Sequence, residues 1–209
     1  ASYSITDFNN LTIAMWDGTE WTEVPSTTTG TASSGSITTN SPVSDFSNYY
    51  FTLGYKSIPK TYVPDDNFEA YLETHDASGN VVSVGDANSM GDGIANNDYV
   101  TTANISGVTS LDVNSQNIAD LTGIEDFTAL TYLNLDNNEL TSLDLSQNLE
   151  LVYLNCSTNV ITSLNLNQNT KLEELITGGN LMQQLDVSGC DSLRYFTSMF
   201  GDMLTSLDF

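Results

Sequence analysis

The sequence predicts a mainly β protein whose C-terminal half is a solenoid of short repeats. From Leu130 onward leucines recur in the frame LxxLxLxxN, and a second copy of this frame follows at once. The whole unit restarts after 21 residues at Leu151, and again at Leu172 and Leu193. A fixed period in this range indicates repeats that cannot bury their apolar faces alone and must stack on one another.

Each repeat is expected to contribute one strand to each of two walls. An LxL pair turns two side chains inward and the residue between them outward, so parallel ladders should run along both walls. The inward pairs are Leu133/Leu135, Leu154/Cys156 and Leu175/Thr177 on the first wall, and Leu143/Leu145, Leu164/Leu166 and Leu185/Val187 on the second. This arrangement is a leucine-rich repeat solenoid with 21-residue repeats.

Asparagines mark the two corners of the repeats. Asn138, Asn159 and Asn180 share one corner, and Asn148 and Asn169 share the other. A side-chain amide at a corner can pair with backbone groups that the turn leaves unsatisfied, and each such bond contributes roughly 1 kcal/mol net. Stacked leucines contribute more, roughly 1.5–3 kcal/mol for each one that is fully buried. Structure rather than chemistry explains these columns.

The composition narrows the classes of partner. Asp and Glu total 27 against 4 Lys and Arg, which gives a formal net charge of −23. Nucleic acid and anionic membranes need the opposite charge, whereas divalent cations and neutral glycans remain compatible. No run of about 18 apolar residues is present, so no membrane insertion is expected. Cys156 and Cys190 fall at different places in the repeat frame, and we expect no disulfide and two small buried hydrophobic residues.

Residues 1–57 are predicted to be a partial β-sandwich-like module. Strands are expected at 11–16 and 19–24 around an Asp17-Gly18 hairpin turn, with a Ser/Thr/Gly loop at 25–34 and further strands near 36–39 and 49–53. The segments LTIAMWDGTEW, SGSITTNSPVSDF and FTLG are similar to a β-rich, adhesin-like module of large secreted proteins of flavobacteria. That resemblance covers about a quarter of the chain.

Residues 58–107 are predicted to form a linker, a capping helix and an Asp/Asn/Gly-rich loop. Asp65 or Asp66 can cap the helix, and Glu69 would complete a capping box with Asp66. The apolar face of this helix, expected to cover the open end of the repeat stack, consists of Phe68, Tyr71, Leu72 and His75. His75 is the only histidine, and we interpret it as a satisfied boundary residue rather than a ligand or a base.

The loop offers a tentative calcium site. Its candidate ligands are Asp86, Asn88, Asp92, Asn96 and Asp98. Calcium binds six to eight oxygens, and these side chains can supply several. Two extra residues precede Asp92 and no glutamate closes the loop, so a solvated, turn-rich insertion is the alternative interpretation.

Residues 108–209 are predicted to be the repeats, continued or capped beyond the chain end. The first repeat, leading to Leu130, has a period of 22 residues and lacks the second LxL, which favours a short helical turn or coil rather than a strand on its back. In the last repeat one residue is inserted between Arg194 and Leu204. We expect further repeats, another domain or a partner, including a second copy of the chain, to cover this end, since solenoids need capped ends.

From Val63 onward the chain resembles the leucine-rich repeat proteins of Bacteroidetes. The resemblance is carried by YVPDDNFEAYLE, NISGVTSLDV, IADLTGIEDFTALTYLNLDNNELTSLDLSQN and LVYLNCSTN. It implies an extracellular, cell-surface protein exported by type IX secretion, and leaves the ligand open.

One outward column on the first wall is a candidate ligand-binding strip, made of Tyr132, Tyr153, Glu174 and Tyr195. Aromatic strips stack on sugar rings or anchor proteins, and the alternative is cross-strand packing that stabilises the wall. On the second wall Asp144, Asn165, Asp186 and Asp208 form a column that we interpret as a hydrated face. Ser192, in Asp-Ser-Leu, is a weak candidate for the O-glycosylation typical of Bacteroidetes.

The sequence contains no catalytic constellation, and we therefore predict no enzyme and no cofactor apart from the calcium alternative. The predicted function is a non-catalytic extracellular module of a large bacterial surface adhesin or filament that binds protein or glycan through the repeat wall. The alternatives are a purely structural spacer or filament-building repeat, and an accessory region of a secreted polysaccharide-degrading enzyme.

Overall fold

The computed structural model describes residues 11–16, 21–24, 26–31, 34–39, 50–55, 58–198 and 205–208, with side chains described for 58–198, 205 and 206. The chain divides into two compact units, Ala1–Ile58 and Pro59–Phe209. We describe each unit by itself. The exact domain boundaries expected from the sequence stay a prediction.

The first unit contains two small antiparallel sheets. β1 (Leu11–Trp16) lies between β2 (Trp21–Val24) and β5 (Tyr50–Tyr55), and it pairs with both in antiparallel register. The two strands that were expected to form a hairpin thus pair, while the Asp17-Gly18 turn lies outside the described residues. The sandwich-like character of the whole module stays a prediction.

The prediction of a loop at residues 25–34 is wrong for most of that range. β3 (Ser26–Thr31) is a strand, and it pairs with β4 (Ser34–Thr39) from Ser26↔Thr39 to Thr31↔Ser34. Threonine is β-branched and favours a pleated sheet, so the Thr-rich composition that suggested a loop is equally suited to a paired strand.

The second unit begins with a small helical region. β6 (Lys60–Tyr62) pairs antiparallel with β7 (Tyr99–Thr101), which leads into the short α2 (Thr102–Ile105). Between β6 and β7 lies α1 (Asp66–Thr74), followed by a long loop. α1 buries Phe68, Tyr71 and Leu72, and the ring of Phe68 stacks on Phe127 of the first repeat with centroids 6.2 Å apart.

Asp65, and not Asp66, is the N-cap of α1. Its Oδ1 accepts hydrogen bonds from the backbone N–H groups of Asn67 and Phe68, both at 3.0 Å. The capping box expected between Asp66 and Glu69 is wrong, because Glu69 turns inward and accepts a hydrogen bond from the N–H of Asn97 at 3.0 Å. The Glu69 carboxylate thus bonds to the loop instead of to the N-terminus of α1.

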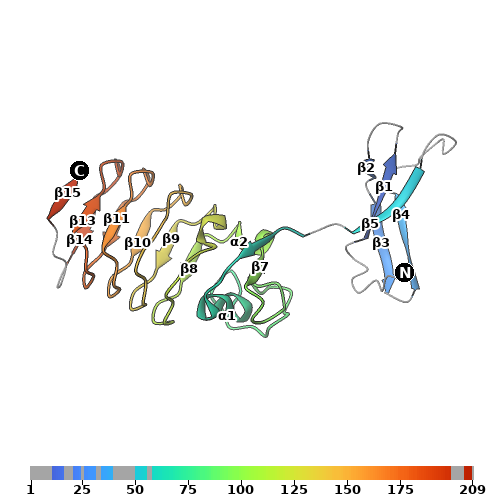
Figure 1. Ribbon diagram of the computed structural model, residues 1–209, viewed down its shortest axis with the longest axis horizontal. Coiled ribbons are helices and arrows are strands. Elements are labelled where there is room, and N and C mark those ends of the chain that lie inside the picture. Colours follow the sequence, from blue (N-terminus) through green and yellow to red (C-terminus); the bar gives the residue numbers. More distant parts are fainter. Residues whose placement is uncertain are drawn as a thin grey trace. The chain divides into compact units, whose positions relative to one another are not determined.

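The solenoid carries a parallel sheet on each side (Figure 1). The first wall consists of β8 (Ser110–Asp112), β9 (Tyr132–Asn134), β10 (Tyr153–Asn155), β12 (Glu174–Ile176) and β14 (Tyr195–Thr197). The second wall consists of β11 (Ser163–Asn165), β13 (Gln184–Asp186) and β15 (Ser206–Asp208). From β9 onward, partners on the first wall are 21 residues apart, as in Leu133↔Leu154↔Leu175. β13 and β15 pair as Leu185↔Leu207, 22 residues apart, as the inserted residue requires.

One expected strand of the second wall does not form. Residues 143–145 are irregular, and Leu143 is only partly buried, although Leu145 is fully buried. The preceding repeat carries the 3-10 helix η2 (Ile124–Asp126) on this side, where a short helical turn or coil was expected. Residues 143–145 therefore have no strand before them to extend, and the ladder starts at β11.

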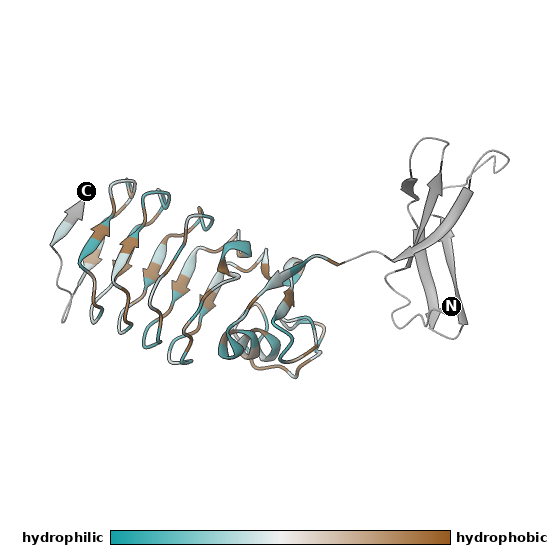
Figure 2. Cartoon of the chain, in the orientation of Figure 1, coloured by the Kyte–Doolittle hydropathy of each residue, from teal (hydrophilic) through white to brown (hydrophobic). Residues whose placement is uncertain are grey.

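The core of the solenoid is a continuous stack of aliphatic side chains. Leu133, Leu154 and Leu175 are completely buried in adjacent turns. Figure 2 shows the hydrophobic residues recurring along the strands, with hydrophilic residues concentrated in the connecting bends. Neither Cys156 nor Cys190 is in a disulfide, and both are buried. The Cys190 Sγ–H donates to the Leu166 carbonyl at 3.3 Å, and burial raises the pKa of this thiol to about 11.

The corner asparagines bind the backbone of neighbouring repeats. The Asn159 Nδ2 group donates to the carbonyls of Leu135 at 2.9 Å and Cys156 at 3.2 Å, and its Oδ1 accepts from the N–H of Leu140 at 3.0 Å. Asn138 and Asn180 repeat this scheme one turn before and one turn after. The role expected for these residues is confirmed.

Candidate functional site

The four residues of the candidate strip lie side by side on the first wall. The strands pair as Tyr132↔Tyr153↔Glu174↔Tyr195, and Ser110 of β8 precedes them in the same column. Each strip residue up to Glu174 is followed by a completely buried leucine, so the strip residues turn outward. Register along the sheet therefore brings the predicted residues together.

Tyr132 and Tyr153 form one rigid aromatic unit. Their ring centroids are 4.5 Å apart with 8° between the ring planes, and both side chains are about half-buried. A hydrogen bond links the hydroxyls of Tyr132 and Tyr153. Loss of hydration raises the pKa of both phenols above its usual value, and the carboxylates of Asp112 and Glu174 raise it further. Both hydroxyls thus remain neutral hydrogen-bonding groups near neutral pH.

The other end of the strip is open. Tyr195 is 68% exposed, and Glu174 separates it from the stacked pair. Ring stacking contributes to the position of Tyr132 and Tyr153 on the wall. Ring stacking of this kind does not account for Tyr195, whose side chain is exposed to solvent.

A polar band runs beside the strip. Asn134 Nδ2 donates to Asp112 Oδ1 at 3.1 Å, and Ser157 Oγ donates to Asp136 Oδ1 at 2.8 Å. These bonds link successive turns and leave the remaining carboxylate oxygens as acceptors. The surface around the rings is therefore acidic and rich in hydrogen-bond acceptors.

A pocket of about 330 Å³ lies at the β8 end of the first wall. Its lining includes Tyr71, Asp76, Ser110 and Asp112, so it joins the helical region to the column of the strip. The His75 ring stacks on Tyr71 with centroids 3.9 Å apart, and its Nδ1–H donates to the Tyr71 carbonyl at 2.9 Å. His75 is thus engaged within α1, as the boundary interpretation expected.

The acidic column of the second wall is engaged in local turns. Asp144 Oδ1 accepts from the N–H of Ser146 at 2.9 Å, and Asp186 Oδ1 accepts from the N–H of Ser188 at 3.0 Å. Hydrogen bonds from these serines lower the pKa of both carboxyl groups. Asn165, Asp186 and Asp208 are in register. A groove of about 440 Å³ beside Asp120, Glu125 and Asp144 is also acidic.

The five candidate calcium ligands of the loop are used in different ways. Asp86 Oδ1 accepts from the N–H of Asn88 at 2.9 Å, which closes a local turn. Asp92 forms an ion pair with Lys60 at 2.7 Å and accepts from Asn97. Loss of hydration raises the pKa of Asp92, but the contacts with Lys60 and Asn97 lower it, and the net result is a lowered pKa. Asn96 and Asp98 have positive φ angles of 57° and 63°.

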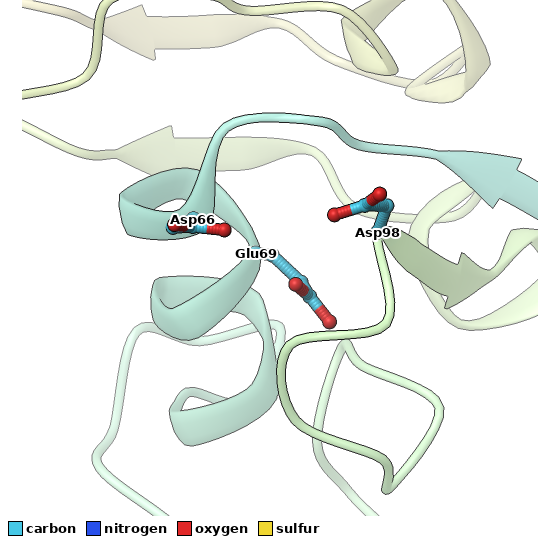
Figure 3. Close-up of side chains that lie close together, drawn as sticks. All are labelled: Asp66, Glu69 and Asp98. Carbon is cyan, nitrogen blue, oxygen red and sulfur yellow. The ribbon is translucent and has the colours of Figure 1, made fainter.

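Three carboxylates do converge, but not the three aspartates of that loop. In the described part of the chain, the group whose ligand atoms all lie within 4.8 Å of one another is Asp66, Glu69 and Asp98 (Figure 3). Only Asp98 belongs to the set predicted from the sequence. Asp66 and Glu69 stand at positions i and i+3 of α1, a spacing that places both carboxylates on one face of the helix. This pair was interpreted from the sequence as a capping box rather than as part of a metal site. Ser192, the glycosylation candidate, is half-buried in the turn before β14.

Comparison with known proteins shows which proteins the solenoid is similar to. No protein-family model matches the chain. Internalin J of Listeria monocytogenes serotype 4b is 47% identical over 51 residues, which are 24% of this chain and 6% of that protein. The solved functional domain of InlJ from Listeria monocytogenes, which includes a cysteine ladder, superposes with a TM-score of 0.58 at 32% identity. That match covers 73% of this chain and 31% of the InlJ chain.

The homologues found are Listeria internalins, which are leucine-rich repeat proteins. The fold is also that of an internalin (inlF) of the same species, with a TM-score of 0.51 at 23% identity over 70% of this chain and 46% of the other. These relatives lend no support to the Bacteroidetes origin, type IX secretion, the filament or the adhesin-like module that the sequence suggested. Since this chain spans under a third of the InlJ structure, the whole protein's activity is a matter for proposal.

The internalin-like solenoid differs from InlJ in its cysteines. A ladder needs cysteines in the same column of successive repeats, whereas Cys156 follows Leu135 in its column and precedes Thr177. Cys190 lies at the corner shared with Asn148 and Asn169. Among the described residues no helix is long and apolar enough to span a bilayer.

Proposed function

We propose that this chain is a non-catalytic, protein-binding module of an extracellular bacterial surface protein, and that its contact surface is the strip Tyr132, Tyr153, Glu174 and Tyr195. The observation that carries the proposal is the stacked, half-buried Tyr132–Tyr153 pair, held in register by the first wall. Two rings fixed before binding lose little conformational entropy on contact, and tyrosines are over-represented among residues that dominate binding energies.

The electrostatics indicate what kind of partner fits. Asp112 and Glu174 lie near the rings, Asp136 belongs to the polar band beside them, and the chain as a whole carries a net charge of −23. A partner with a basic surface would be attracted over distance, and an arginine of that partner could stack on a tyrosine face. We therefore favour a protein with an exposed basic patch over a glycan.

Finer features of the solenoid support this proposal. We propose that the 21-residue repeat spaces the strip residues evenly, and that α1 acts as the N-terminal cap, because Phe68 covers Phe127 at the start of the repeats. A capped, rigid wall keeps the strip in one geometry.

The test is binding of the whole chain to a panel of extracellular proteins with basic surfaces and to a glycan array. Replacing both Tyr132 and Tyr153 with Ala should weaken protein binding by roughly 30-fold or more, the threshold for a residue that dominates an interface. The matched control is the double replacement of Tyr62 and Tyr99 with Ala. These two tyrosines form another exposed ring pair, with centroids 5.5 Å apart, away from the strip.

Three outcomes would contradict the proposal. If both double variants bind alike, the strip is not the contact surface. If only glycans bind, the partner class is wrong. If the chain binds neither class, a structural spacer becomes the better interpretation. Circular dichroism of each variant checks that the solenoid remains folded.

A further inference from the structure

Two glutamates of α1 are buried one helical turn apart. Glu69 and Glu73 are each about 1% exposed. Both oxygens of Glu73 are satisfied: Oε1 accepts from the N–H of Asp92 at 2.6 Å, and Oε2 accepts from the N–H of Gly93 at 3.1 Å. Gly91 leaves room for this carboxylate, since a Cβ there would come within 2.1 Å of it. Glu73 therefore needs no further partner.

Glu69 is different. Its Oε1 accepts the hydrogen bond from Asn97, but its Oε2 is inaccessible to solvent and has no hydrogen-bond partner. A buried carboxylate oxygen without a donor is costly, and native proteins rarely leave one.

Two further carboxylates lie beside the Glu69 carboxylate. Asp66 lies one turn earlier on α1, and Asp98 follows Asn97 in the loop that leads into β7; Figure 3 shows Glu69 between them. One ligand oxygen of each lies within 4.8 Å of those of the other two. In the described part of the chain the ion pairs of Lys60, Lys171 and Arg194 involve other carboxylates. Three carboxylates thus converge, and among the described residues no ion pair with a Lys or Arg involves them.

We propose that Asp66, Glu69 and Asp98 bind one calcium ion, which fastens α1 to the loop before β7. Calcium–oxygen distances are about 2.3–2.6 Å, so two ligand oxygens on one ion lie at most about 5 Å apart, which accommodates the observed spread. Magnesium–oxygen distances of about 2.0–2.1 Å restrict this separation to about 4.2 Å and fit less well. Asp66 is exposed, so water can complete the coordination.

This site is distinct from the loop group suggested by the sequence. It shares Asp98 with that group but uses two helical residues in place of Asp86, Asn88, Asp92 and Asn96. It is also separate from the tyrosine strip, so binding at one can be tested without the other.

The test is titration of the whole chain, freed of divalent ions, with calcium chloride by isothermal calorimetry and thermal unfolding. One ion should bind with a dissociation constant of about 0.1–1 mM, the range of extracellular calcium modules. At about 10–100 times that concentration, Tm should rise by about 3–10 °C. Magnesium chloride, and sodium chloride at matched ionic strength, control for general screening of the negative charge.

Two variants target the site. Glu69→Gln keeps the shape and the acceptor for Asn97, and its amide can donate to Asp66 or Asp98, so calcium affinity should fall at least about tenfold while the calcium-free Tm is kept. Asp98→Asn should have the same effect on affinity, since Asn tolerates a positive φ. The matched control is Asp86→Asn, which should bind calcium within about twofold of the unchanged chain.

Several results would overturn the inference. These are no heat of calcium binding up to about 10 mM, a Tm rise that sodium chloride reproduces, or equal affinity in Glu69→Gln and the unchanged chain. A loss of binding in Asp86→Asn with retention in Glu69→Gln would instead assign calcium to the loop.

Discussion

A corner asparagine such as Asn159 connects three backbone segments through one side chain. Its amide reaches back to Leu135 in the preceding turn and to Cys156 in its own, and its carbonyl holds the N–H of Leu140. At the opposite corner Asn148 and Asn169 use only their amide groups, and their Oδ1 atoms are buried without a protein partner. The first corner is therefore the more strongly hydrogen-bonded of the two.

Replacing Asn159 with Ala should destabilise the solenoid by roughly 2–4 kcal/mol, because buried backbone groups left unpaired cost roughly 1–3 kcal/mol each. Urea unfolding followed by circular dichroism measures the change. The exposed Asn167 provides the control, and its replacement with Ala should stay within about 0.5 kcal/mol. Equal effects at the two positions would refute a special role for the buried corner.

At the scale of elements, Asp65 bonds both to α1 and to the first repeat. Asp65 Oδ1 caps the helix, while its Oδ2 accepts from the N–H groups of Ala119 at 2.8 Å and Asp120 at 3.1 Å. One carboxylate accepts four backbone hydrogen bonds, two from the first turn of α1 and two from the first repeat. The orientation of α1 on the solenoid thus depends on a cap shared between two elements.

We expect Asp65→Ala to lower the free energy of unfolding by about 1–3 kcal/mol, since the cap and the two bonds to the first repeat are lost together. Asp65→Asn should lose less, because it keeps a cap oxygen but presents an amide to the two N–H donors. Chemical denaturation in calcium-free buffer separates these variants. Glu139→Ala, at an exposed acidic position, should be near neutral; a comparable loss there would point to net charge as the cause.

At the scale of the whole molecule, the dominant feature is the excess of negative charge. A net charge of −23 with few cations leaves most carboxylates without an ion-pair partner, and self-repulsion opposes the compact state. The Lys171–Glu150 and Arg194–Glu173 pairs join successive turns but are exposed, so each contributes little.

Stability should therefore rise with ionic strength. Between about 10 mM and about 500 mM sodium chloride the Debye length falls from about 30 Å to under 8 Å, which screens repulsion between separated carboxylates. The midpoint of urea unfolding should move upward over this range. A flat or falling midpoint would mean that ion pairs outweigh repulsion.

The sequence by itself determined the repeating part of this protein. The leucine period, the two walls, the corner asparagines and the column through Tyr132 and Tyr153 all follow from a frame in which each residue meets its equivalent one turn away. Such contacts are local and recur, so one repeat predicts the next. The N-cap was also narrowed to Asp65 or Asp66, because capping involves only neighbouring residues, and the structure selects Asp65.

Only the tertiary structure decided the contacts that no period constrains. The pairing of Ser26–Thr31 as a strand, the irregular course of residues 143–145 and the inward turn of Glu69 each depend on which segment lies alongside. The convergence of Asp66 and Glu69 with Asp98 depends on the path of a loop of some twenty residues between helix and strand. The sequence distance between Asp98 and the two helical acids does not indicate that they meet, so only the tertiary structure identifies this candidate metal site.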